Sequence, residues 1–296
     1  MTNTLIEASR WFLFLSVELM ALFLGVSFLV GLLQAWIPDE KVSAFLNRKN
    51  PVIGYVMGAA LGAATPFCSC STVPIVAGLL SSGAPFGPVM SFLIASPILN
   101  PVILSLLFIV VGFQGTLVYA VITFLASIVV GALWARLGLK ADVKRVRVRG
   151  GKSLSHSSKG SIWQQAWEQA WSFFTPMIPY LLLGTAIGAF IYGFVPSDWI
   201  VAIAGPQQPF AIPVAAVIGV PIYVRAETMI PIAQALLTKG MGTGAVIALI
   251  IGGAGASIPE VSLLAGLFRP RLVVAFVISI FIIATASGVI FDLTTV

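Results

Sequence analysis

The residues with the most distinctive chemistry are two cysteines, Cys68 and Cys70, which are the only cysteines in the chain. They lie one position apart in the segment 65–74, between two prolines that interrupt regular helix. No charged residue occurs from Asn50 to Ala135. The pattern therefore predicts a pair of thiols on a broken stretch of backbone inside apolar sequence.

Thiolates are soft ligands that select soft, thiophilic species over Mg²⁺ or Ca²⁺. With Ser69 and Ser71 alternating beside them, Cys68 and Cys70 are spaced to reach one small soft centre, such as a metalloid. A structural zinc site is not expected, because it usually takes four ligands and no histidine or further cysteine is nearby. The alternative interpretation is that both cysteines are small buried residues that permit close helix packing.

The chain also contains an internal repeat. The segment Pro74–Gly83 is echoed by Pro231–Gly240, which begins 157 positions later. The apolar sequence before the second copy is interrupted near 221–228, as it is near the cysteines. Interrupted segments at corresponding places in two halves are the best sequence indication of a binding site in a transporter.

The repeat places Arg225 and Glu227 opposite the two cysteines. Each break is followed by an expected helix start, with Ser71 or Thr72 as the cap of the first helix and Pro74 in its opening turn. The positive ends of two half-helices would then point into one site. Arg225 is expected to be a further contact for the substrate.

Three acidic residues, Glu18, Glu227 and Glu260, lie in apolar sequence. An ionisable side chain at membrane depth costs at least ~2.5 kcal/mol, so each of them is a functional candidate. We interpret them as groups that exchange a proton for substrate. The alternatives are an internal ion pair between Arg225 and an acid and, for Glu18, a polar link between two helices.

A further break is expected at Asn100, between Pro97 and Pro101. Its counterpart is the glycine-rich segment 252–260, which ends in Glu260. Unwound backbone at these positions would line a solute pathway, with Asn100 and Glu260 as its polar groups. Helix kinks filled by neighbouring side chains are the alternative.

Composition identifies the class of protein. The chain is 59% hydrophobic and 9% charged, with a mean hydropathy of +1.06, whereas a soluble domain carries roughly 25% charged residues. We therefore expect an all-α, multi-pass membrane protein, in which each helical span needs about 20 apolar residues. Six stretches meet this requirement, 11–37, 88–113, 115–135, 171–196, 241–259 and 272–291, and two broken segments, 51–82 and 209–238, do not.

The basic residues indicate the organisation of the chain. We expect a first membrane repeat over 1–137, a basic cytoplasmic linker over 138–162 and a second membrane repeat over 163–296. If the broken segments are re-entrant, the basic residues at 38–50, in the linker and at 269–271 all face the cytoplasm, as the positive-inside rule requires. This favours two inverted repeats with both termini outside. The basic patch is local, so no nucleic-acid partner is expected.

The run Thr65–Pro74, followed by Ser91–Pro101, resembles the predicted permease family that includes ArsP-type organoarsenical efflux permeases. The similarity extends over essentially the whole membrane part. It implies a permease of the bacterial inner membrane and, for characterised members, export of trivalent organoarsenicals. Trivalent arsenic is thiophilic, which agrees with the chemistry of the two cysteines.

We therefore expect a secondary-active permease that exports a small thiophilic solute by proton exchange, with a trivalent organoarsenical as the first candidate. No nucleotide-binding motif G-x-x-x-x-G-K-[ST] is present, so ATP hydrolysis by this chain is not expected. As a permease, the chain is expected to be neither an enzyme nor dependent on a cofactor. The expected partners are the solute, membrane lipid and a second copy of the chain. The alternatives are a permease for another soft or sulfur-containing solute, a membrane thiol oxidoreductase that uses Cys68 and Cys70, and a non-catalytic subunit of a larger assembly.

Overall fold

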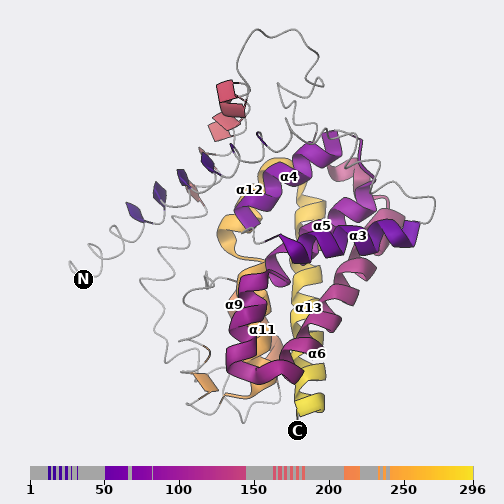
Figure 1. The fold of residues 1–296 in the computed structure, drawn as a ribbon, viewed down its shortest axis with the longest axis vertical. Helices are drawn as coiled ribbons and strands as arrows, with labels where there is room; N and C mark the ends of the chain where they lie inside the picture. The colour runs from indigo at the N-terminus through magenta and orange to yellow at the C-terminus, as the bar shows by residue number, and fades with distance from the viewer. Residues whose placement is uncertain are drawn as a thin grey trace.

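Helices make up nearly all of the regular structure in the described residues of this computed structural model (Figure 1). The structure describes residues 51–65, 69–81, 83–144, 210–220 and 241–295, together with single positions within 13–32, 163–183 and 233–237. In chain order the helices are α3 (Pro51–Ala64), α4 (Ser69–Ser81), α5 (Phe86–Ile98), α6 (Pro101–Arg136), the short 3-10 helix η1 (Leu139–Asp142), α9 (Ala211–Gly219), α11 (Thr243–Gly255), α12 (Ile258–Leu267) and α13 (Pro270–Thr295).

Two helices are long and apolar enough to cross a membrane, Val111–Arg136 of α6 and Pro270–Leu293 of α13. They coincide with the spans predicted at 115–135 and 272–291. Two further predicted spans, 11–37 and 171–196, lie mostly outside the described residues.

The predicted spans at 88–113 and 241–259 are bent helix pairs rather than straight helices. α5 meets the first part of α6 at 41°, and α11 meets α12 at 40°. Each pair is either one broken span or a re-entrant loop. By length and composition, the described residues therefore contain two helices that could cross a membrane, or up to four if each bent pair is one span.

The helices recur at a constant spacing of 157 positions. α5 and α11 are both 13 residues long, and they begin at Phe86 and Thr243. α6 and α12 follow them after the same interval, at Pro101 and Ile258. Residues separated by 157 positions are called counterparts below.

Glycines let the shorter helices approach α5 and α11 closely. A Cβ atom at Gly62 of α3 would lie 2.9 Å from the carbonyl oxygen of Phe92 in α5, which is too near for an ordinary contact. Its counterpart, Gly219 of α9, lies against the carbonyl oxygen of Leu249 in α11. Small residues at such interfaces allow backbone-to-backbone packing, which is the usual way that helices associate in lipid.

The two long helices lie side by side and run antiparallel (Figure 1). Toward one end, the indole Nε1 of Trp134 in α6 donates a hydrogen bond to Ser279 Oγ in α13 at 3.2 Å, and its ring lies 6.4 Å from that of Phe276 between centroids. Toward the other end, Gly115 of α6 lies against the ring of Phe291. Residue numbers therefore rise along one helix as they fall along the other.

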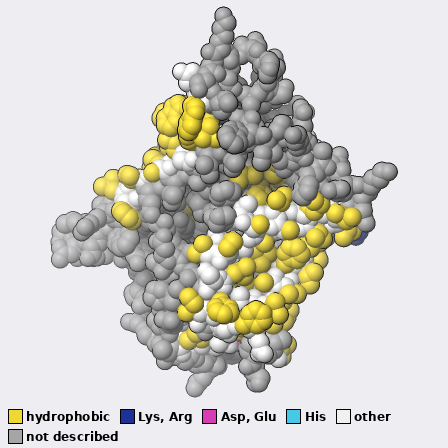
Figure 2. Space-filling view, viewed as in Figure 1, with side chains coloured by type: hydrophobic (Ala, Val, Ile, Leu, Met, Phe, Trp, Pro, Cys, Tyr) yellow, Lys and Arg dark blue, Asp and Glu magenta, His cyan; other side chains and the backbone are white. Residues whose placement is uncertain are grey.

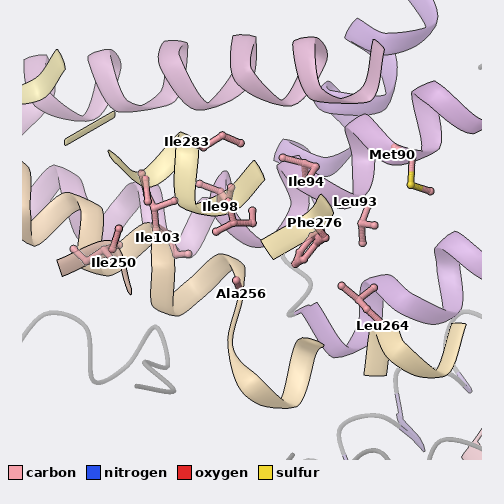
Figure 3. Packing of buried hydrophobic residues seen from close by; sticks show 14 of the residues in the cluster. Met90, Leu93, Ile94, Ile98, Ile103, Ile250, Ala256, Leu264, Phe276 and Ile283 are labelled. Atoms are coloured by element: carbon pink, nitrogen blue, oxygen red, sulfur yellow. The ribbon is translucent and has the colours of Figure 1, made fainter. Parts of the chain in front are cut away.

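The buried core forms where the bent pairs meet the long helices. Side chains from both halves of the chain contribute to it, and Figure 3 shows them converging. Those labelled in Figure 3 are Met90, Leu93, Ile94, Ile98, Ile103, Ile250, Ala256, Leu264, Phe276 and Ile283.

The outer surface is also apolar, and Figure 2 shows hydrophobic side chains over much of the described part of the face in view. Along α6 the exposed side chains recur every four residues, so they form one outward stripe. The stripe consists of Phe113, Leu117, Val121, Leu125, Val129 and Leu133. Such a surface is suited to lipid rather than to water.

Apart from the buried Glu260 of α12, the charged residues of helices α3 to α13 and their connections that the structure describes lie at the two ends of the bundle. All the described Lys and Arg residues belong to one end, where α6 and η1 finish and α13 starts: Arg136, Lys140, Lys144, Arg269 and Arg271. Toward the opposite end, the Gly244 amide of α11 donates to Asp292 Oδ1 of α13 at 2.7 Å. This carboxylate caps a helix whose own N-cap residue, Gly242, has no side chain.

The close approach at Gly62 and Gly219 generates a prediction. Gly62→Ser or Gly219→Ser should lower the free energy of unfolding by about 1–3 kcal/mol, because the added atoms overpack a backbone contact. Thermal unfolding in detergent measures the change. Gly242→Ser is the matched control, since nothing lies within 4 Å of that position; equal melting temperatures for all three variants would contradict the prediction.

Candidate functional site

The first element of the site is the break between α5 and α6. Asn100 is the N-cap of α6, and its Oδ1 accepts a hydrogen bond from the Val102 amide at 2.9 Å. Pro101 occupies the start of the helix, where its missing N–H costs nothing. The break expected at Asn100 is thus present, and its side chain is engaged in holding it.

The second element is the break between α11 and α12. Ala256 leaves helical geometry at φ −142° and ψ 40°, and Ser257 is extended at φ −61° and ψ 151°. Glu260 then lies in the first turn of α12 and is only 2% exposed. A carboxylate in this turn interacts favourably with the positive end of the helix.

The two breaks meet in the middle of the core. A Cβ atom at Gly255, the last residue of α11, would lie 3.4 Å from Ile98 Cγ1, and Ile98 is the last residue of α5. Ile98 and Gly255 are counterparts, so the helices abut through equivalent ends. α6 and α12 start within three residues of this point, so Asn100, the N-cap of α6, and Glu260, in the first turn of α12, belong to the same region of the fold.

A buried tyrosine supports the first break. Tyr119 of α6 is 1% exposed, and its hydroxyl donates to the Ile98 carbonyl oxygen at 2.8 Å. The bond supplies a partner for a carbonyl at the end of α5, where helical hydrogen bonding stops. The counterpart of Tyr119 is Phe276, which has no hydroxyl and cannot donate the equivalent hydrogen bond at the second break.

The cysteine helix differs from the expectation in its starting point. α4 begins at Ser69, so Cys70 lies in its first turn and Pro74 lies inside the helix rather than in its opening turn. The expected cap by Ser71 or Thr72 is therefore wrong. Thr72 Oγ1 instead lies 2.9 Å from Ser96 Oγ, and both side chains are buried. This bond fastens the first turns of α4 to the end of α5, where a hydroxyl pair satisfies two polar groups at once.

α4 also packs against α12 (Figure 1). The helix that carries Cys70 therefore contacts the helix that carries Glu260, although the two residues are far apart in the sequence. Together the two helices bring two helix N-termini, the Glu260 carboxylate and the backbone of Cys70 into a largely apolar environment. Such a setting strengthens electrostatic interactions with any polar solute that enters it.

Several predicted site residues lie outside the described residues, so their proximity to this region stays a prediction. They are Glu18, Cys68, Arg225 and Glu227, and the side chains of Ser69, Cys70 and Ser71.

The sequence reasoning missed the hydroxyl contacts. Thr72 and Ser96 are 24 positions apart, and Tyr119 lies 21 positions from the carbonyl it binds. No local pattern marks such pairs. The one available signal was Ser96, a polar residue next to Pro97 just before the break.

The chain is similar to a family of predicted permeases and to several known proteins. The model of a family described as predicted permease matches residues 4–293. The UPF0718 protein MJ0584 of Methanocaldococcus jannaschii is 22% identical over 81% of this chain and 84% of its own. The UPF0718 protein YraQ of Escherichia coli is 27% identical over 84% of this chain and 70% of its own. A Streptococcus mutans protein named as a subunit of a two-component membrane permease complex is 28% identical over 47% of this chain and 46% of its own. No solved structure matches the chain.

The buried hydroxyl pair generates a prediction. Thr72→Val or Ser96→Ala alone should cost about 1–3 kcal/mol of unfolding free energy, because each removes the buried hydrogen bond between the two hydroxyls. The double variant should recover part of that loss, since both polar groups are then gone. Thermal unfolding of the four proteins gives the coupling energy; strictly additive losses would show that the two hydroxyls do not interact.

Proposed function

The chain belongs to the ArsP-type predicted permease family, and from that premise we propose that it is a secondary-active permease that exports a small thiophilic solute. A trivalent organoarsenical is the first candidate, and the bacterial inner membrane is the proposed location. The observation that carries the proposal is the meeting of two broken helix pairs at Ile98 and Gly255, with the Cys70 helix packed on the Glu260 helix. Broken helices at a central point of the fold are where transporters of this kind bind solute.

The proposed architecture is two inverted repeats with six long spans and two broken segments. Three observations support it. The helices recur every 157 positions, the long helices that correspond to one another run antiparallel, and the counterparts Ile98 and Gly255 lie next to each other. Counterparts that lie next to each other, together with corresponding helices that run antiparallel, are what a two-fold axis in the membrane plane produces. Rocking of one half against the other would expose the site to each side in turn.

The proposed orientation places the cationic end of the bundle in the cytoplasm. The described Lys and Arg residues gather there, and cytoplasmic flanks of spans are enriched in these residues. α13 runs from this end to the opposite one, so the C-terminus is proposed to lie outside.

In the proposed mechanism Cys68 and Cys70 bind the soft centre of the solute, with Ser69, Ser71 and Arg225 around it. Thiolates prefer such a centre over hard cations. Glu260 is proposed to carry the exchanged proton. A charged carboxylate is costly in this buried position, so binding of a proton to Glu260 is coupled to release of the solute. Glu227 and Glu18 are proposed as further proton carriers.

A second candidate function is that of one subunit in a two-component permease complex. The similarity to the Streptococcus mutans protein supports it. Transport would then require a second polypeptide, and the isolated chain would move no solute.

The proposal is tested by uptake into everted membrane vesicles, with and without a proton gradient. The panel contains trivalent methylarsenic and phenylarsenic species, arsenite, antimonite and a small thiol. Cys68→Ser/Cys70→Ser should abolish accumulation, because hydroxyls are poor ligands for a soft centre. Glu260→Gln should abolish the stimulation of solute accumulation by the proton gradient, while movement of the solute down its own concentration gradient persists.

Glu168→Gln is the matched control, since Glu168 is exposed and is not part of the proposed site. Transport that persists without either thiol would exclude the cysteines as the binding residues. Transport that appears only after a second polypeptide is added would favour the two-component complex.

A further inference from the structure

The chain segment Asp142–Lys144 holds the end of α12, and we call this segment the clasp. Its backbone pairs with residues 267–269, which join α12 to α13. Val143 and Phe268 form an antiparallel bridge. The Lys144 amide donates to the Leu267 carbonyl oxygen at 3.0 Å, and the Arg269 amide donates to the Asp142 carbonyl oxygen at 2.8 Å. The clasp and the α12–α13 connection therefore each donate one backbone hydrogen bond to the other, which attaches the clasp to this corner.

The Lys144 side chain completes the attachment. Its Nζ donates to the Ala265 carbonyl oxygen in the last turn of α12 at 2.6 Å. Carbonyls in the last turn of a helix have no partner within the helix, and a cation there also interacts favourably with the helix dipole. Lys144 is half-buried, so solvent weakens this bond less than it would at the surface.

The clasp matters because α12 is short and its other end is also a break. α12 has only ten residues, between Ser257 and Phe268. Its first turn carries Glu260, and one side of it packs against α4. A ten-residue helix is too short to be stable alone, so the position of Glu260 depends on what holds the two ends of α12.

The corresponding corner in the first half is built differently. There the counterpart of Arg269 is Gly112, which bends α6 at φ 78°. Nothing lies within 4 Å of a Cβ atom built at Gly112. Among the described residues, the clasp therefore belongs to the half that carries Glu260 and has no equivalent at the Gly112 corner.

We propose that Lys144 is a positioning residue that holds α12, and through it Glu260, against α4. The proposal rests on the proposed function to the extent that Glu260 exchanges the proton. Lys144 belongs to the polypeptide that leaves the first half of the chain, so the segment between the halves takes part in setting the geometry of the site.

Hydrogen–deuterium exchange on the full-length protein in detergent tests the attachment without any substrate. Lys144→Ala should speed exchange in residues 258–267 by about tenfold, the factor expected for loss of one charge-assisted hydrogen bond. Exchange in residues 69–81 of α4 should also rise, because α12 packs against it. Lys140→Ala is the matched control, since Lys140 is an exposed lysine in the adjoining η1. Lys144→Arg should restore wild-type exchange, because arginine can donate the same bond.

Transport of trivalent methylarsenic in everted vesicles tests the effect on the site. Lys144→Ala should lower kcat for proton-driven transport more than it changes KM, because the proton carrier on α12 is displaced directly, whereas the cysteine helix α4 is affected only through its packing on α12. Lys144→Arg should recover the wild-type kcat. A purely structural defect would reduce the amount of folded protein and would not separate kcat from KM.

Unchanged exchange in α12 after Lys144→Ala would overturn the proposal. Faster exchange in α12 without any change in α4 would also overturn it, since Lys144 would then only cap a helix. If the wild-type protein moves none of the panel, the proposed function fails, while the exchange data still decide whether Lys144 positions α12. If Lys144→Ala does not fold, Lys144→Gln, which keeps a donor but loses the charge, should give a smaller increase of the same pattern.

Discussion

Every break in an apolar helix leaves backbone groups that need hydrogen-bond partners, and this requirement governs the structure. In lipid no water replaces a lost helical bond, so broken segments persist only where protein or a watery cavity supplies partners. Here the partners are specific. Asn100 caps α6, the Tyr119 hydroxyl binds the Ile98 carbonyl, and Lys144 binds the Ala265 carbonyl at the end of α12. The breaks are therefore stable parts of the fold, and they provide the polar groups from which a site can be built.

Close backbone packing is the second requirement for placing the breaks together. Gly62 and Gly219 let α3 and α9 lie directly against α5 and α11, and the spacing of 157 positions is the same in both contacts. The ends of α5 and α11 then abut at Ile98 and Gly255. Because this packing has little room for added atoms, the two helix starts beside it are fixed relative to one another.

The described helices α5 and α11, and the starts of α6 and α12, recur at the same spacing, but different groups stabilise them. Tyr119 has Phe276 as its counterpart, and Asp292, which caps α11, has Ala135. The first half carries the thiols, whereas the second carries Glu260 and is held by the clasp. If the proposed repeats are correct, this difference would let one repeat bind the solute while the other carries the exchanged charge.

The sequence by itself determined the class of protein and the positions of its interruptions. Apolar composition predicted membrane helices, and prolines with polar neighbours marked the breaks at Asn100 and near Pro259, because the conformational limits of proline are local. Repetition of the same signals predicted which residues correspond. Only the tertiary structure decided which of these elements touch. The bond between Thr72 and Ser96, the packing of α4 on α12 and the pairing of the clasp with residues 267–269 join positions far apart in the chain. Such contacts depend on how whole helices pack, and no local propensity specifies them.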